Sequence, residues 1–311
     1  MGSHDVRLRR GILVARQVVG NAAVCLEVRS LPLGRRNRGA AQADAEVAID
    51  SVEADHWLNG CALHRRNFGL CTLAYTGMSG LSDVELLGVE MELLWDSDHG
   101  PDLVVACARD GVRARIARWL PPAFAQSVVA ALESVQPSID FSVTPPVVDR
   151  LRVRLEEAMG AGVRLTRESG PSFLIEEEVR VPTPTETVNS ASTDVHVLEG
   201  ANPGNWRPDE WRDLLAGRLG AWVMAVVDRR VVSICHTPVA NDRAAEAGTW
   251  TRPDFRGRGL AAACTAEWAR LLRPSGRLLF YSTSRSNRSS QRVAGRLGLR
   301  QLGCLWQLRR A

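Results

Sequence analysis

The segment Arg256–Ala261 restricts the possible folds of this chain more than any other segment. It reads Arg-Gly-Arg-Gly-Leu-Ala and lies between a predicted strand, Glu246–Thr251, and a predicted helix, Ala261–Leu272. Two glycines let the backbone approach a bulky anion, and successive N–H groups then converge on that anion together with the positive end of the helix. The arginines add charge-assisted hydrogen bonds. The segment therefore predicts a site for a pyrophosphate-type group, although a glycine-rich turn alone is a weak signal.

The elements around this loop predict a mixed α/β domain over residues 194–311. The expected strands are Asp194–Leu198, Ala221–Val227, Val231–His236, Glu246–Thr251, Leu278–Ser282 and Leu299–Leu308, and the expected helices are Trp206–Leu219, Ala261–Leu272 and Arg288–Leu297. The order β-α-β-β-β-α-β-α-β has a central antiparallel portion.

Two common phosphate-binding loops do not fit this segment. It lacks the Gly-Lys-Ser/Thr of a Walker A loop, and no β-α-β unit with an acid about 20 residues further on follows it, as a dinucleotide-binding fingerprint requires. Downstream, Asn287 is well placed to cap a helix and Gly298 to end it.

Together these features resemble the GNAT superfamily of acyl-CoA-dependent N-acyltransferases. That family has a Gln/Arg-x-x-Gly-x-Gly/Ala loop and a second helix that begins Asn-x-x-Ser/Ala and ends Leu-Gly-Phe. The matching residues here are Arg256, Gly259 and Ala261 for the loop, and Asn287, Ser290 and Leu297-Gly298-Leu299 for the helix. The resemblance covers about residues 193–308 and extends to two-domain actinobacterial members.

The resemblance implies where acetyl-CoA binds. The strand Glu246–Thr251 should splay from Leu278–Ser282, so that backbone groups near Trp250 pair with the pantetheine arm. Loop amides should hold the pyrophosphate, and Asn287 and Ser290 should contact the pantetheine or its thiol end. The implied cofactor-binding residues are Trp250, Thr251, Arg256, Gly257, Arg258, Gly259, Leu260, Ala261, Asn287 and Ser290. The chain has one strand after the second helix where many members have two, so either the N-terminal domain completes the sheet or this domain is minimal.

Two residues are candidates for acid–base catalysis. Glu246 lies on the strand that would face the acceptor, so it could accept the amine proton, directly or through a water. The alternative is an exposed or salt-bridged strand acid. Many family members carry a general-acid tyrosine seven residues after the helix-opening asparagine, but that position here is Ala294. Tyr281 could replace it, although a tyrosine beside Phe280 on a central strand is more often a core residue.

The first 193 residues predict a smaller α+β domain and its connections. Residues 1–54 are expected to be a poorly ordered, Arg-rich segment, residues 55–180 the α+β domain, and residues 181–193 a linker rich in Pro, Thr and Ser. The Asp-Gly pair after Leu103–Ala108 predicts a hairpin, and helices are expected after Pro121-Pro122 and over Val147–Met159.

Composition narrows the possible partners and the cellular compartment. The net charge is +4, with eight Arg in residues 1–40 and seven acids between Asp83 and Asp102. A basic tail beside an acidic segment does not resemble a nucleic-acid-binding face. The seven scattered cysteines predict reduced, buried thiols of a cytoplasmic protein, without a metal site. No apolar run is long enough to span a membrane.

The sequence thus predicts direct transfer of an acetyl group from acetyl-CoA to a primary amine, with a small molecule as acceptor. The acid-rich stretch suggests a polycationic acceptor, such as a polyamine or an aminoglycoside, but its simplest interpretation is a solvated face. Two alternatives stay open: acetylation of a protein lysine or N-terminus, and binding of acyl-CoA by a sensor without turnover.

Overall fold

The computed structural model describes residues 13–19 and 23–30 by their backbone, and then residues 80–94, 100–133, 135, 140–177, 179, 186–193 and 195–311. All of these except Gly80 belong to one compact unit. Among the helices of this described part, none is long and apolar enough to cross a membrane.

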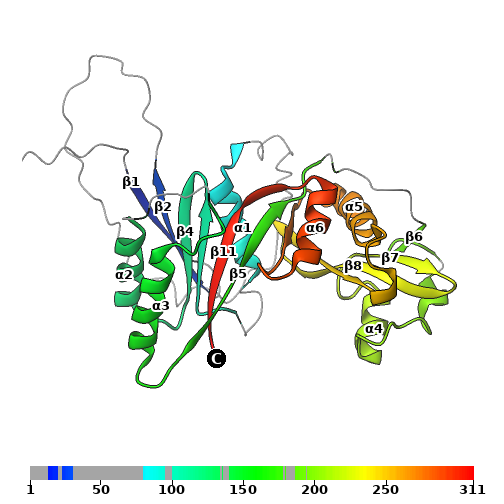
Figure 1. Cartoon of the computed structure of the whole chain (residues 1–311), viewed down its shortest axis with the longest axis horizontal. Coiled ribbons are helices and arrows are strands. Elements are labelled where there is room, and N and C mark those ends of the chain that lie inside the picture. Colours follow the sequence, from blue (N-terminus) through cyan, green and yellow to red (C-terminus); the bar gives the residue numbers. More distant parts are fainter. Residues whose placement is uncertain are drawn as a thin grey trace, which may run out of the picture. The chain divides into compact units, whose positions relative to one another are not determined.

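One eleven-stranded sheet runs through the unit (Figure 1). In spatial order its strands are β1 (Leu13–Val19), β2 (Ala23–Ser30), β4 (Gly111–Ala117), β3 (Leu103–Ala108), β11 (Arg300–Arg310), β5 (Leu165–Leu174), β10 (Leu278–Ser282), β9 (Ala244–Thr251), β8 (Arg230–Ala240), β7 (Trp222–Val227) and β6 (Thr187–Asn189). The helices are α1 (Asp83–Leu93), α2 (Pro122–Glu133), α3 (Pro146–Met159), α4 (Pro208–Leu215), α5 (Leu260–Leu272) and α6 (Arg288–Leu297). Only β9 and β10 pair in parallel; every other pairing described is antiparallel.

The two halves of the chain exchange strands at the centre of the sheet. Strand β5, which precedes residue 194, lies between β10 and β11, and β11, at the end of the C-terminal part, lies between β3 and β5. Along this seam Cys304 pairs with Cys107 on one side and with Pro171 on the other. The N-terminal part of the chain therefore completes the sheet of the C-terminal part, which resolves the alternative that the sequence left open.

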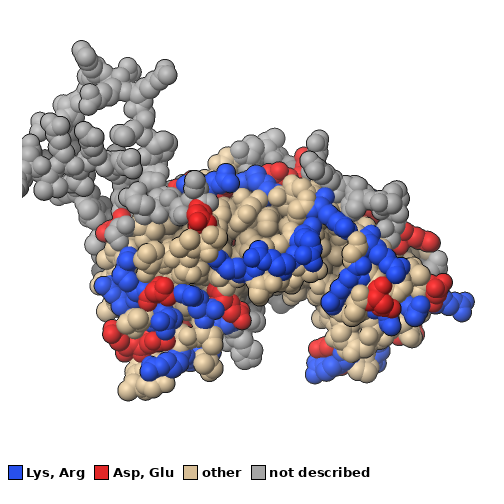
Figure 2. Space-filling model, in the orientation of Figure 1, with Lys and Arg blue, Asp and Glu red and all other residues tan. Residues whose placement is uncertain are grey.

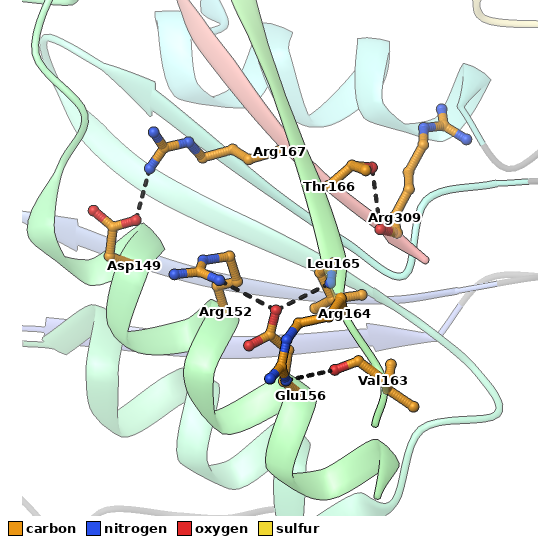
Figure 3. Close-up of polar contacts among 9 residues, drawn as sticks. All are labelled: Asp149, Arg152, Glu156, Val163, Arg164, Leu165, Thr166, Arg167 and Arg309. Atoms are coloured by element: carbon orange, nitrogen blue, oxygen red, sulfur yellow. Dashed lines mark hydrogen bonds and ion pairs between the residues drawn. The ribbon is translucent and has the colours of Figure 1, made fainter. Parts of the chain in front are cut away.

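Polar contacts with α3 hold the first half of β5 in place. The carboxylate of Glu156 accepts hydrogen bonds from the Leu165 amide at 3.0 Å and from Arg152 at 3.1 Å, and Arg167 pairs with Asp149 at 2.6 Å (Figure 3). The Leu165 hydrogen bond, followed by the nearby arginines, lowers the pKa of Glu156. These contacts join an exposed helix surface to a strand that lies inside the sheet.

The second half of β5 approaches the loop after β10 closely at Gly170. A Cβ at this position would lie 1.7 Å from the backbone oxygen of Thr283. We expect Gly170→Ala to lower the free energy of unfolding by about 1–3 kcal/mol, because the backbone must move to admit the methyl group. Gly295→Ala, in α6, meets no atom within 4 Å and should stabilise the protein by about 0.5–1 kcal/mol. Urea unfolding of both variants measures the difference, and equal stability would show that β5 does not need this close approach.

Helices cover both faces of the sheet. α2 and α3 pack on the face that includes Val105, Ile116 and Trp306, while α1 packs against β3, β4, β9 and β11. α5 and α6 share a core with Tyr281, and α4 packs with Trp222 in a separate core. The described cysteines, Cys107, Cys235, Cys264 and Cys304, are buried free thiols, as the sequence predicted.

Most elements expected after residue 200 are confirmed, with bounds that shift by a few residues. The strand expected at Asp194–Leu198 is wrong: Val195–Leu198 is a 3₁₀ helix, in which Leu198 is buried and Val197 exposed. A four-residue alternation is too short to distinguish a strand from a helical turn. The edge strand β6 instead lies within the segment predicted as a linker, part of which falls outside the described residues.

Two expectations for the N-terminal part are also corrected. The segment 1–54 was predicted to be poorly ordered, but β1 and β2 lie within it, and pairing with β4 explains how so short a hairpin is held. The other residues of that segment are outside the described part. In the described part of the acid-rich stretch, residues 83–94 and 100–102, the acids do not form a solvated face: this part contains α1, and Glu90 and Asp102 are buried.

Candidate functional site

The site begins where β9 and β10 separate. Their parallel pairing runs from Leu278 with Ala244 to Phe280 with Glu246 and ends there. Beyond Glu246, β9 continues to Thr251 beside β8 only. A register shift in β8 between His236 and Val239 lies directly beside this point, and such irregularities bend a strand. The expected splay between the two strands is therefore present.

The glycine loop follows the free end of β9. Gly257 and Gly259 have φ values of +81° and +85°, a region that side chains strongly disfavour. Gly259 is the N-cap of α5, and the first helical hydrogen bond runs from the Ala263 amide to the Gly259 oxygen at 3.0 Å. The amides that precede Ala263 in the first turn have no acceptor within the helix. They point outward at the positive end of the helix dipole.

A pocket of about 450 Å³ lies between this loop, the end of β9 and α6. It brings together all but one of the predicted cofactor-binding residues: Trp250, Thr251, Arg256, Gly257, Gly259, Leu260, Ala261, Asn287 and Ser290. The exception is Arg258, whose guanidinium stacks 4.5 Å from the ring centre of Phe255 and donates to the Asp254 oxygen. Whether these residues bind acetyl-CoA stays a prediction, but they share one cavity.

The pocket is basic. Among the described residues that line it, three are arginines (Arg256, Arg292 and Arg296) and none is acidic. Figure 2 shows basic side chains gathered over the part of this face where α6 lies. Arg256 donates to the Thr251 oxygen at 3.2 Å, and Arg296 donates to the Gly257 oxygen at 3.1 Å, so both also brace the loop. A multiply charged anion fits this lining.

Arg292 and Arg296 line the pocket but were not predicted as site residues from the sequence. With Arg288 they are spaced i, i+4, i+8 along α6, which places all three on one helix face. Because α6 begins at the cap residue Asn287, whose side chain accepts from the Ser290 amide at 3.0 Å, this spacing could have predicted a basic face toward the loop.

Tyr281 does not line the pocket, but its hydroxyl contacts two residues that do. The side chain is 1% exposed and packs in the same core as Ala294. Its hydroxyl lies 2.7 Å from Ser290 Oγ and 3.3 Å from Thr249 Oγ1, and both partners line the pocket. Burial raises the pKa of Tyr281, so the phenol stays protonated at neutral pH.

Glu246 projects from the opposite face of the sheet. It pairs in register with Phe280, the neighbour of Tyr281, so side-chain alternation separates the two candidate catalytic groups. The carboxyl of Glu246 is half-buried and accepts a short hydrogen bond from Ser282. Burial raises the pKa of Glu246 above its ordinary value, while the Ser282 hydrogen bond lowers it.

His236 lies on β8, where it pairs with Gly248 of β9. Its ring contacts that of Trp206 edge-on, with 5.0 Å between the ring centres, and a Cβ on Gly248 would lie 2.8 Å from it. Burial lowers the pKa of His236, so the ring is neutral at neutral pH. In the part of the chain that the structure covers, no group of three or more His, Cys, Asp or Glu side chains is placed to hold a metal ion.

Comparison with known proteins supports a family assignment for the second half. Residues 210–304 match the family model described as GNAT acetyltransferase. No curated protein sequence matches the chain.

Several solved structures are similar at low identity. The chain is similar to a GCN5-related N-acetyltransferase-like protein from Streptococcus suis (16% identity, TM-score 0.37, 69% of this chain and 86% of that chain covered). It is also similar to GCN5-related N-acetyltransferases from Kribbella flavida (18%, 0.36, 52% and 61%) and Sphaerobacter thermophilus (14%, 0.38, 77% and 89%). The function of this protein is therefore argued from the family match and the pocket.

Proposed function

We propose that the protein transfers an acetyl group from acetyl-CoA to a primary amine of a small molecule, from the premise that residues 210–304 match the GNAT acetyltransferase family model. The observation that supports this most strongly is the pocket at the splay of β9 and β10. There the exposed amides of the α5 N-terminus, three arginines and the free edge of β9 line one cavity.

The donor set of this pocket suits acetyl-CoA. A pyrophosphate needs several converging donors, which the loop amides and arginines supply. A pantetheine arm carries amide groups that can pair with an open strand edge, and β9 from residue 247 to Thr251 offers such an edge toward β10. When bound, acetyl-CoA supplies the activated acyl group. Backbone N–H groups near Trp250 would stabilise the negative charge that develops on the thioester oxygen.

Glu246 is the proposed general base. An alkyl amine is protonated at neutral pH and must lose a proton before its nitrogen can attack. Glu246 stands at the point where β9 and β10 separate, on the face opposite Tyr281. Its raised pKa brings the carboxyl closer to neutral pH, where a general base is most effective.

Tyr281 and Ser290 are the proposed source of the proton for the leaving sulfur. Because Tyr281 is buried, its proton can reach the pocket only through a partner, and Ser290 Oγ lies 2.7 Å from the phenol and lines the cavity. Ala294, where many family members have a tyrosine, packs in the same core.

The acceptor is proposed to be a small amine and remains open in detail. The acid-rich stretch gives little support for a polycation, because its described carboxylates already have partners. Asp83 pairs with Arg300, Glu92 with Arg243 at 2.8 Å, and Asp102 with Arg310 at 3.2 Å. A protein amine and a non-catalytic acyl-CoA sensor are the alternatives.

An acceptor screen that follows release of free thiol from acetyl-CoA tests this function. An acetyltransferase releases CoA in proportion to one class of amine. Turnover with peptides alone would favour the protein-directed alternative, and binding without turnover on any amine would favour the sensor.

Binding itself is tested by thermal unfolding. A ligand that binds only the folded state stabilises it by RT ln(1 + [L]/Kd), about 2.7 kcal/mol at 100 times Kd. We therefore expect saturating acetyl-CoA to raise the Tm by several degrees. Adenosine, which lacks the phosphates and the pantetheine arm, should give a much smaller shift. An unchanged Tm at millimolar acetyl-CoA would contradict the proposed function.

A further inference from the structure

A second carboxyl, contributed by the first half of the chain, lies close to Glu246. Glu90 of α1 is 1% exposed, although the acid-rich stretch to which it belongs was interpreted from the sequence as a solvated face. Ser172 of β5 donates a short hydrogen bond to Glu90 Oε2. The other carboxyl oxygen, Oε1, is buried without a hydrogen-bond partner among the described residues. A buried, half-satisfied carboxyl costs stability and calls for a functional explanation.

Two serines connect Glu90 with Glu246. Ser172 binds Glu90, and Ser282 binds Glu246. Ser172 and Ser282 are direct partners across the antiparallel pair of β5 and β10, so their side chains lie on the same face. The row Glu90, Ser172, Ser282, Glu246 therefore crosses three strands and one helix, with a hydrogen bond at each end and the two serines as neighbours across the strand pair.

We propose that Glu90 is a proton store for the acetyl transfer, which takes up, through Ser172 and Ser282, the proton that Glu246 removes from an alkylammonium acceptor. This inference rests on the proposed function. Glu90 acts through Glu246 and need not touch the acceptor, so it is a positioning residue.

The proton balance of the step is complete. Glu246 removes one N–H proton from the ammonium, and this frees the nitrogen lone pair. Each hydroxyl of the row then passes on one proton as it receives another, so Glu90 gains a proton and Glu246 is ionised again. The nitrogen forms its bond to the acyl carbon as the carbon–sulfur bond breaks. A second nitrogen proton leaves to solvent, the sulfur takes a proton from Tyr281 through Ser290, and Tyr281 regains its proton from solvent. The row later returns its stored proton to solvent, so the net reaction releases one proton.

The electrostatics of the row agree with this role. Burial, and then the negative charge of Glu246, raise the pKa of Glu90 to about 8, while the Ser172 hydrogen bond lowers it. A pair of coupled carboxyls thus titrates near neutral pH, where one ordinary glutamate would not. This brings the proton affinity of the pair closer to that of an alkyl amine.

The other charges around α1 are accounted for. On β4, the half-buried Arg113 lies against Gly88, and Arg115, two residues further along the strand, is buried. Arg300 of β11 pairs with Asp83, and Arg243 pairs with Glu92. β3 presents no charged side chain. The charge that acts on Glu90 most strongly is that of Glu246.

The test compares Glu90→Gln with Glu92→Gln, a control two residues away on the same helix. The measurement is kcat/KM for an alkyl amine from about pH 6 to about pH 9, given as the ratio of wild type to variant, which cancels the titration of the acceptor itself. We expect the ratio for Glu90→Gln to rise at least roughly 10-fold as the pH passes about 8. Above this pH the carboxyl of Glu90 is ionised and can accept the proton, whereas the variant has no carboxyl at this position. The ratio for Glu92→Gln should stay near 1. A ratio for Glu90→Gln that does not change with pH would overturn the proposal.

A second measurement does not need turnover, and it separates failure of this inference from failure of the proposed function. Because the pKa of Glu90 is raised from its ordinary value of 4.5 to about 8 in the folded protein, stability from this group is full below pH 4.5 and is lost progressively as the pH rises toward about 8. The Tm of the wild type should therefore fall more steeply between these two pH values than that of Glu90→Gln. In Glu246→Gln the fall should end at lower pH, because the charge that raises the pKa of Glu90 is gone. Identical pH dependence in all three proteins would overturn the coupled pair, whether or not an acceptor has been found.

Discussion

Gly259→Val is expected to abolish measurable acetyl-CoA binding while the protein remains folded. Gly259 is the N-cap of α5 with φ +85°, and its neighbours supply the amides that converge on the pocket. A branched side chain at this residue strains the turn and stands where the pyrophosphate must approach the backbone. Loss of two charge-assisted hydrogen bonds, at about 1.5–3 kcal/mol each, weakens binding at least roughly 100-fold. Isothermal titration with acetyl-CoA measures the loss.

A control variant distinguishes the effect of backbone strain from the effect of blocked access to the loop amides. Gly276 has a similar left-handed conformation, φ +70°, and a Cβ there meets no atom within 4 Å. It caps the short 3₁₀ helix Arg273–Ser275, and it does not line the pocket. Gly276→Val should lower the Tm by a similar amount and leave the affinity for acetyl-CoA unchanged. If both variants lose affinity equally, or if Gly259→Val binds as the wild type does, the loop is only a turn.

Glu246→Gln is expected to lower kcat by about 100- to 10,000-fold, the usual contribution of a general base. The affinity for acetyl-CoA should change little, because Glu246 does not line the described pocket. The difference should depend on pH. Protonation of the carboxyl removes the base from the wild type at low pH, so the ratio of wild type to variant should narrow as the pH falls through the raised pKa.

A half-buried acid outside the site provides the matched comparison for that substitution. Glu267 lies in α5 and pairs with Arg270 at the helix surface, so Glu267→Gln removes the same charge away from the splay. Its kcat should equal that of the wild type. Equal kcat for Glu246→Gln and the wild type across the pH range would assign Glu246 to structure, and the proton would then have to leave through water or the acceptor itself.

The C-terminal part of the fold and most of the pocket could be predicted from the sequence because their signals are local. The glycines of the loop, the cap at Asn287 and the stop at Gly298 each act within a few residues, and the structure places them as expected. The splay of β9 from β10 followed only from the resemblance to a family, since no local pattern encodes where two strands part.

The features that could not be predicted from the sequence depend on contacts with residues far away in the chain. α1 carries apolar residues all around its circumference, so it has no amphipathic stripe that would identify it as a helix. Glu90 appears in the sequence as one of several acids, and only its contact with Ser172, which is far away in the chain, distinguishes it. The insertion of β5 is also invisible locally, because most of its residues are polar and residues 166–168 stay exposed, so no apolar pattern identifies it as a strand between two others.

The exchange of β5 and β11 has a consequence for synthesis on the ribosome. Domains of a chain commonly fold one after another as they emerge. Here β3 cannot gain its second neighbour until β11 has been made, roughly two hundred residues later. Throughout that interval β3 exposes an open, apolar edge of the kind that aggregates. The nascent first half is thus an expected client of chaperones that shield strand edges, and it would be a poor candidate for separate expression.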